Sequence, residues 1–341
     1  MSNIKYFKSS FIVTFLGLIL GAFVGYYYKG TPAGAMEALF ICAVLVVLEV
    51  SISFDNAVVN ATVLKDMTPA WQHRFLTWGM LIAVFGMRLV FPLVIVAVVA
   101  SLNPWEALVM AATEPDRYAQ IMTSVHHEVA AFGGAFLMLV ALKYFFDVEK
   151  DVHWIRVIER PLARMGRLNA VEVGLTLLFI YLMSNYVGAD ERMGFTFAGI
   201  AGILTFLGVE AVGTFLQAPE ATVKDIHKAS AGMFLYLEVL DASFSFDGVI
   251  GAFAVTNNLF IFAIGLGIGA MFVRSLTIMM VDKGTLEAFR FMEHGAFYAV
   301  WALAIIMFVG TVVHIPEVIT GLVGAAFIGL SIWDSRRKHA Q

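Results

Sequence analysis

The stretch "EVSISFDNAV", residues 49–58, places two carboxylates and a carboxamide in the middle of a long apolar run. The polar side chains are Glu49, Asp55 and Asn56. An ionised side chain removed from water in such a run costs several kcal/mol unless it is paired with a cation, and it otherwise takes up a proton. The stretch therefore predicts a buried polar site that has a purpose beyond packing.

The composition of the whole chain indicates a polytopic membrane protein. Of the 341 residues, 60% are hydrophobic and 14% are charged, and the mean hydropathy is +0.84. The single cysteine, Cys42, excludes an internal disulfide and a multi-cysteine metal site, so an ion bound here is held by oxygen or imidazole. With a net charge of -4 and no basic patch, we expect no nucleic-acid partner, and we expect no prosthetic group.

The apolar segments predict an all-α bundle of about ten spans, because about 20 apolar residues in a helix cross a bilayer core. The predicted spans are 11–28, 35–64, 70–100, 125–146, 170–188, 194–217, 229–256, 258–281, 288–310 and 315–333. Most lysines and arginines fall in connections on the side of the N-terminus. This bias predicts a multi-pass protein of the cytoplasmic (inner) membrane of a prokaryote, in contact with lipid and with both termini in the cytoplasm.

Two stretches of the chain repeat each other. Sliding the sequence by 192 residues lays "EVSISFDNAV" over "DASFSFDGVI", residues 241–250, so that Glu49 matches Asp241 and Asp55 matches Asp247. The following spans match as well, through Gly79 and Arg88 against Gly265 and Arg274, and through Gly134-Ala135-Phe136 against Gly295-Ala296-Phe297. The second member of each pair lies five spans after the first. Successive spans cross the membrane in opposite directions, so an odd separation means that the two members run in opposite directions. We therefore expect an inverted three-helix repeat, the usual build of secondary transporters.

The repeat divides the chain into five segments. They are an N-terminal anchor helix (1–33), the first repeat (34–147), an interfacial helix with two connecting spans (148–227), the second repeat (228–311), and a last span with a cytoplasmic tail (312–341). The stretch 103–120 between two spans is acidic, and it is either a cation-collecting outer loop or a solvated linker.

The two matching motifs predict a cation site near the middle of the membrane. The acids of each motif are six residues apart, about 240° around a helix, so either the helix is interrupted or the acids face different partners. The neighbouring serines and glycines favour an interruption that lines a cavity. Such oxygen-rich surroundings suit manganese, magnesium or calcium as the transported ion. The candidate ligands are Glu49, Ser53, Asp55, Asn56, Glu238, Asp241, Ser245 and Asp247, with Arg88 and Arg274 as charge-balancing residues.

Structural interpretations of the same residues stay open. Asp55 and Asp247 could form buried salt bridges with Arg88 and Arg274 that only lock the bundle. Glu210 is an isolated acid near a helix end, and it either joins the site, faces an inner cavity or has a structural role.

The chain resembles the TerC family of integral membrane proteins, within the group of inverted-repeat exporters that includes the lysine exporters. The resemblance lies in "SFDNAV" (53–58), "FSFDGVIGAFAVT" (244–256) and "FRFMEHGAFYAVWAL" (289–303), and it covers roughly 35–147 and 228–307. It implies a divalent metal exporter, with manganese favoured, and it points to Asp55, Asn56 and Asp247 as ligands. Gly248 and Gly251 stand where the family commonly has a serine and a proline, so this chain looks like an atypical branch.

Taken together, the residues and the resemblance predict a transporter and not an enzyme. We expect one divalent cation to be exported by alternating access in exchange for protons. The alternatives are a membrane scaffold or a component of a stress-resistance complex, in which the buried ion pairs are structural, and a membrane-embedded metalloenzyme. Whether the chain forms a homo-oligomer is left open.

Overall fold

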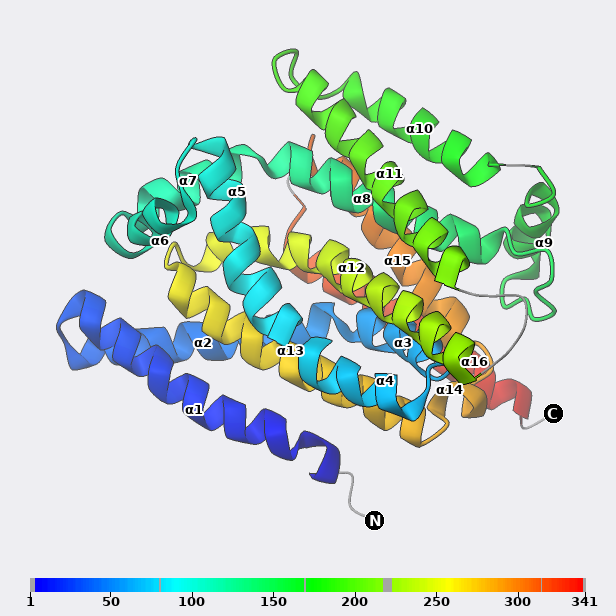
Figure 1. The fold of residues 1–341 in the computed structure, drawn as a ribbon, viewed down its shortest axis with the longest axis horizontal. Coiled ribbons are helices and arrows are strands. Elements are labelled where there is room, and N and C mark those ends of the chain that lie inside the picture. Colours follow the sequence, from blue (N-terminus) through cyan, green and yellow to red (C-terminus); the bar gives the residue numbers. More distant parts are fainter. Residues whose placement is uncertain (1–3, 80, 169, 217–222, 314, 340–341) are drawn as a thin grey trace.

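The structure is a computed structural model that describes residues 4–79, 81–168, 170–216, 223–313 and 315–339 (Figure 1). Within these residues all regular structure is helical, which confirms the predicted all-α bundle. Eight helical segments in the described part of the chain are long and apolar enough to cross a membrane. The protein is therefore a multi-pass helical membrane protein.

The eight candidate spans follow the predicted segments closely. They lie in α1 (Ile4–Lys29), α2 (Pro32–Ile52), the segment Pro69–Val99, α8 (His126–Phe145), α11 (Arg192–Leu216), α13 (Leu259–Asp282), α15 (Met292–Gly310) and α16 (Glu317–His339). Two further predicted spans correspond to α10 (Val171–Ser184) and α12 (Val223–Val255). The 14 residues of α10 extend about 21 Å, which is shorter than a bilayer core.

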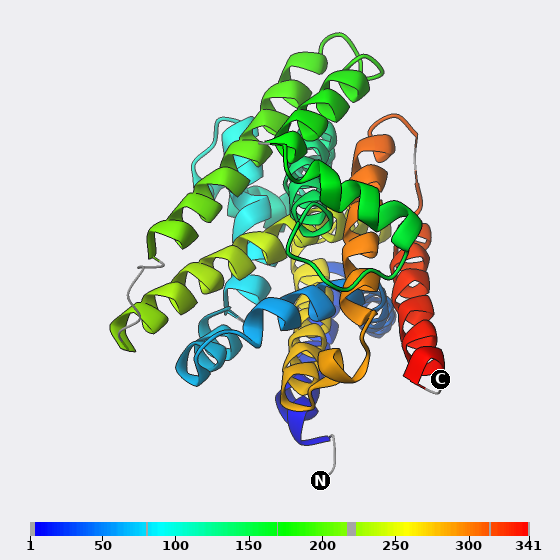
Figure 2. The same cartoon turned by 90° about the vertical axis from the view of Figure 1, so that its right-hand side faces the viewer.

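The two ends of the bundle carry different short helices (Figure 1). At one end lie α9 (Arg156–Met165), α14 (Thr285–Ala288) and the last turns of α16, and at the other lie α6 (Pro104–Thr113) and α7 (Pro115–Ser124). Figure 2 looks from the first end and shows α10 and α11 at one edge of the bundle, with α1 at the opposite edge. The polar connections thus gather at the two ends of the bundle, and the long apolar helices lie between them.

The first matched pair of helices runs antiparallel. The first repeat begins with α2 and α3 (Phe54–Leu64), and the second repeat begins with α12. The Asn60 side chain reaches Asp241, with Nδ2 2.5 Å from Oδ1, while Glu49 lies beside Gly248. Residue numbers rise along one helix as they fall along the other.

The other two matched pairs show the same reversal. In the second pair, the carbonyl of Phe75 accepts a hydrogen bond from Arg274 at 2.7 Å, and a methyl group added at Gly267 would lie 3.1 Å from Val84. In the third pair, α8 and α15, the rings of Tyr144 and Phe297 stack at 3.8 Å. Eleven residues further along α15, the Phe308 ring faces Gly134 of α8. All three matched pairs run antiparallel, as an inverted repeat requires.

The third span contains π-helix that the sequence analysis did not predict. It runs through α4 (Pro69–Arg74), the π-helices η1 (Phe75–Gly79) and η2 (Ile82–Val90), and α5 (Phe91–Val99). Pro92 near the start of α5 has no N–H to donate to the Arg88 carbonyl, and its ring crowds that carbonyl. The proline explains why the winding of η2 loosens immediately before it, in a segment that contains Arg88.

The acidic stretch 103–120 is helical and not irregular, because it forms α6 and the first part of α7. The Asn103 side chain accepts a hydrogen bond from the Glu106 amide at 2.9 Å, and the Glu106 carboxylate accepts one from the Asn103 amide at 3.0 Å. This capping box, with Pro104 and Pro115 at the starts of the two helices, is the sequence signal for the two helices.

Candidate functional site

Glu49 and Arg88 form a buried ion pair between α2 and η2. Arg88 Nη2 contacts Glu49 Oε1, and its Nη1 donates to the Ala83 carbonyl at 2.7 Å. The Ser53 hydroxyl lies 3.3 Å from the same Glu49 oxygen. Glu49 is 4% exposed and Arg88 is 5% exposed, so the two charges neutralise each other out of contact with water.

Arg274 of α13 pairs with two acids of α12. Its Nη2 lies 2.8 Å from Asp241 Oδ2 and 3.5 Å from Glu238 Oε1. Arg274 also stacks over the Phe75 ring, with its guanidinium carbon 4.2 Å from the ring centre. The Asp241 carboxylate is held from its other side by Asn60, so this cluster ties α3 of the first repeat to α12 and α13 of the second.

The two ion pairs are formed by equivalent residues of the internal repeat. Glu49 matches Asp241 and Arg88 matches Arg274, so each repeat carries the same contact between its first and second helices. The interpretation in which Asp55 forms a salt bridge with Arg88 is therefore wrong, because Arg88 pairs with Glu49. Arg274 likewise contacts Glu238 and Asp241. The side chain of Asp247 lies outside the described residues, although its backbone belongs to α12.

The first motif is interrupted at a single residue. α2 ends at Ile52 and α3 begins at Phe54, with Ser53 between them at φ −90° and ψ 18°. The start of a helix leaves amides without helical carbonyl partners, and one of them, that of Asn56, donates to Asp55 Oδ1 at 3.0 Å. The break thus places the carboxylate of Asp55 at a helix start inside the apolar core, where the helix dipole stabilises negative charge.

The second motif contradicts the expected interruption, because α12 continues through it as a helix. The Ser243 hydroxyl donates to the Val239 carbonyl one turn earlier at 3.0 Å, which satisfies the hydroxyl without unwinding the backbone. Ser245, also on α12, is buried. The interruption offered for the six-residue spacing therefore applies to the first motif and not to the second.

Asp55 is the buried acid of this region that no lysine or arginine among the described residues neutralises. It is 4% exposed, and its side chain accepts a hydrogen bond from the Asn56 amide. Its second oxygen, Oδ2, faces α16, where a methyl group on Gly324 would lie 3.7 Å away. A carboxylate in this position is stable only with a bound cation or a proton.

Several buried oxygens near these acids accept no hydrogen bond from any described residue. They are Oδ1 of Asn56, Oδ1 of Asn60 and Oε2 of Glu238, whose other oxygen lies 3.5 Å from Arg274. Oxygen atoms of carboxylates and carboxamides are the ligands that hard divalent cations prefer. Among the described residues, however, no three histidine, cysteine, aspartate or glutamate side chains already meet in a metal-binding arrangement.

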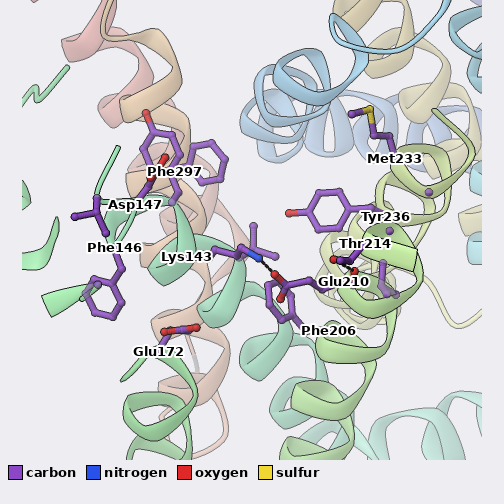
Figure 3. Close-up of a pocket in the computed structure, with 17 residues that line it drawn as sticks. Lys143, Phe146, Asp147, Glu172, Phe206, Glu210, Thr214, Met233, Tyr236 and Phe297 are labelled. Carbon is purple, nitrogen blue, oxygen red and sulfur yellow. Dashed lines mark hydrogen bonds and ion pairs between the residues drawn. The ribbon is translucent and has the colours of Figure 1, made fainter. Parts of the chain in front are cut away.

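A cavity of about 650 Å³ opens between α8, α10, α11, α12 and α15 (Figure 3). Its lining includes the acids Asp147, Glu172 and Glu210 with the base Lys143, and Figure 3 shows Lys143 and Glu210 facing each other. Glu210 thus faces an inner cavity and is paired, and it does not join the buried acids. On α12 the cavity reaches Tyr236, which is five residues, or about 7.5 Å, before Asp241.

The close approach of α13 to Glu49 gives a stability prediction. A methyl group added at Gly269 would lie 2.5 Å from both Cβ and Cγ of Glu49, atoms that cannot move without shifting the Glu49–Arg88 pair. We expect Gly269→Ala to lower the free energy of unfolding by about 1–3 kcal/mol, measured by thermal unfolding in detergent. Gly208→Ala is the matched control, because no atom lies within 4 Å of the added group and alanine favours the helix.

Comparison with known proteins returns one family. A family model described as "Protein of unknown function (DUF475)" matches residues 54–341. The match begins one residue before Asp55 and includes the whole second repeat, whereas α1 and α2, with Glu49, precede it. No curated protein and no solved structure matches the chain.

Proposed function

The chain belongs to the DUF475 family, and from that premise we propose that it is a membrane transporter that exports a divalent metal cation by alternating access. Manganese is the favoured substrate, with calcium and magnesium as the other candidates, and protons move in the opposite direction. In this proposal the protein lies in the cytoplasmic membrane of a prokaryote, with both termini and α9 on the cytoplasmic side.

The unpaired carboxylate of Asp55 carries the proposal. A protein that only needed a rigid bundle would neutralise this acid with a base, as it does for Glu49 and Asp241. An acid without a base in the apolar core exchanges between a protonated form and a cation-bound form. This exchange is what a carrier that couples metal export to proton uptake requires.

The unpartnered oxygens support the choice of a hard cation. Asn56 follows Asp55 on α3, and Asn60 lies one turn further along and contacts Asp241 of the other repeat. We propose that Asp55, Asn56, Asn60, Asp241 and Glu238 supply ligands from both repeats, together with Asp247. In this proposal the cation-bound state brings these groups from the two repeats around one ion.

The cavity beside α12 supports a route to this site. Its acids outnumber its single lysine, which favours cations over anions. The resemblance of the two motifs to TerC proteins favours a metal over an organic cation. In this proposal the Lys143–Glu210 contact lies on the path between the cytoplasm and the buried acids.

A scaffold role is the second candidate, and the two ion pairs are the observation that favours it. Each pair connects helices that a purely structural protein would also have to hold together. A scaffold keeps these pairs without moving any ion, so flux separates the two candidates.

The proposal is tested by reconstituting the purified protein in liposomes and measuring uptake of manganese, calcium and magnesium with trapped indicators. We expect saturable flux of one ion, faster when the compartment that receives the metal is the more acidic one, because protons then move against the metal. Empty liposomes give the leak rate. Flux at the leak rate for all three ions, from protein shown to be folded and inserted, would exclude the transporter, and flux indifferent to the pH gradient would exclude proton exchange.

A further inference from the structure

The short helix α9 has three distinct faces, and one of them carries arginines that the proposed transport site does not use. Arg160 and Arg164 lie one turn apart on the same face of α9, and Arg167, in the turn that follows the helix, lines the same hollow as they do. Ile155, Glu159 and Leu162 fall on the face toward the bundle, where Glu159 is buried and Ile155 and Leu162 are partly buried. The functions of the arginine face and the bundle face are therefore separable by mutation.

The bundle face holds α9 firmly in place. The Glu159 carboxylate is 1% exposed and accepts hydrogen bonds from the amides of Trp154 and Ile155 at 3.1–3.2 Å. Lys150 and His294 lie 3.6 Å and 3.4 Å from the same carboxylate, and His294 belongs to α15. The helix is thus fixed to the second repeat, so the side chains on its other faces point in defined directions.

The arginine face lines a hollow of about 250 Å³. Its lining consists of Val148, His153, Arg160, Ala163, Arg164 and Arg167, without any acid. None of the three arginines forms an ion pair with a described residue. Glu159 of the same helix, in contrast, lies within 4 Å of Lys150, His153 and His294. Three guanidinium groups that share one hollow repel each other unless an anion lies between them.

The third face of α9 is apolar and exposed. Val157 and Met165 of α9 are 86% and 37% exposed, and Leu168, in the turn after the helix, is 61% exposed. A helix with an exposed apolar face bordered by arginines lies in the membrane interface, with the apolar side chains in the lipid and the arginines at the level of the headgroups. The hollow therefore opens where lipid phosphates are.

We propose that this hollow binds the phosphate of an anionic phospholipid headgroup, held by Arg160, Arg164 and Arg167. Arginine binds phosphate oxygens through paired N–H groups, so three guanidinium groups around one hollow favour phosphate over a carboxylate or a neutral headgroup. Basic pockets beside membrane-spanning helices bind anionic lipid headgroups in this way. The lipid, rather than a soluble phosphate, is the ligand because the adjacent face of α9 places acyl chains beside the hollow.

The site does not depend on the transport proposal. It lies on the connection between the two repeats, and α9 contacts α8 of the first repeat and, through Glu159, α15 of the second. A lipid bound here adds a contact that exists only in a membrane with anionic headgroups. We therefore expect phosphatidylglycerol to stabilise the folded protein more than phosphatidylcholine does.

The test uses the full-length protein, stripped of lipid in detergent and titrated with short-chain phosphatidylglycerol or phosphatidylcholine, with bound lipid counted by native mass spectrometry. We expect tight binding of phosphatidylglycerol. Changing Arg160, Arg164 and Arg167 together to glutamine should weaken it about a hundredfold, because each arginine contributes about 1 kcal/mol and about 1.4 kcal/mol corresponds to a tenfold change in affinity. The matched control is Arg156→Gln, which removes the same charge from the same helix outside the hollow and should leave affinity within about threefold of the wild type.

Three results would overturn the assignment. They are equal binding of phosphatidylcholine, unchanged affinity in the triple variant, and equal stabilisation by soluble glycerol 3-phosphate, which would make the ligand a soluble phosphate. All three arginines are exposed, so their replacement leaves the core intact, and elution at the wild-type volume in size-exclusion chromatography confirms a folded variant. A variant with lysine at all three positions keeps the charge and is expected to recover part of the affinity.

Discussion

Replacing Arg88 by glutamine is expected to destabilise the protein by about 3–5 kcal/mol, because the change leaves Glu49 buried without its counter-charge. Few single changes cost this much, and the cost reflects the desolvated acid more than the lost attraction. Glu49 has Ser53 as its other described polar partner, at 3.3 Å, and that hydroxyl cannot replace a guanidinium. The measurement is the free energy of unfolding of the detergent-solubilised protein.

The double variant Arg88→Gln, Glu49→Gln distinguishes a paired charge from a packing effect. Removing both charges abolishes the desolvation cost, so we expect the double variant to be more stable than Arg88→Gln alone by about 2 kcal/mol or more. If the two single changes simply add in the double variant, the charges are not coupled and the pair does not hold α2 to η2. Arg117→Gln, an exposed arginine of α7, is the control for removing a charge from the surface.

The sequence allowed the repeat to be predicted because its members share residue types at fixed spacings. The nine residues between Gly79 and Arg88 recur between Gly265 and Arg274, and the helices that carry them run antiparallel with Phe75 against Arg274. Equal spacings in the sequence give equal positions on two helices, because an α-helix has a fixed rise and rotation per residue. The positions of the spans could be predicted as well, because the length and hydropathy of a segment indicate whether it can cross a membrane.

The pairing of the charges could not be predicted in the same way. Each motif offers two acids six residues apart, and which one meets the arginine depends on how far neighbouring helices slide and rotate. Glu49 meets Arg88 partly because Gly269 and Gly248 leave room for its side chain, and neither glycine is close to it in the sequence. The break at Ser53 and the continuous α12 also depend on tertiary contacts, because both motifs have similar serines.

The structure thus combines a symmetric part with an asymmetric part. The symmetric part is the pair of ion pairs, which join the first two helices within each repeat. The asymmetric part is the helix break at Ser53 with Asp55 beside it, which occurs in the first repeat and not in the continuous α12. The ion pairs hold the first two helices together in both repeats, whereas the break at Ser53 gives the first repeat a place where the backbone can change.

Asp55, beside the helix break at Ser53, is the residue whose replacement should affect transport most. Changing Asp55 to asparagine is expected to reduce metal flux at least about a hundredfold, equivalent to losing about 3 kcal/mol of interaction with the cation. Asparagine has nearly the same shape and its Oδ1 still accepts the hydrogen bond from the Asn56 amide, but it can neither neutralise a cation nor exchange a proton. The same change removes an unpaired carboxylate from the apolar core, so the folded protein should be as stable as the wild type or more stable.

The combination of lost flux and retained stability is what separates a transport residue from a structural one. If Asp55 held the bundle together, Asp55→Asn would lower the unfolding temperature as Arg88→Gln is expected to do. Asp66→Asn makes the same chemical change two residues beyond the end of α3, on an exposed side chain, and should leave both flux and stability unchanged. Wild-type flux in Asp55→Asn would exclude this carboxylate from the transport site, and with it the observation on which the transporter proposal mainly rests.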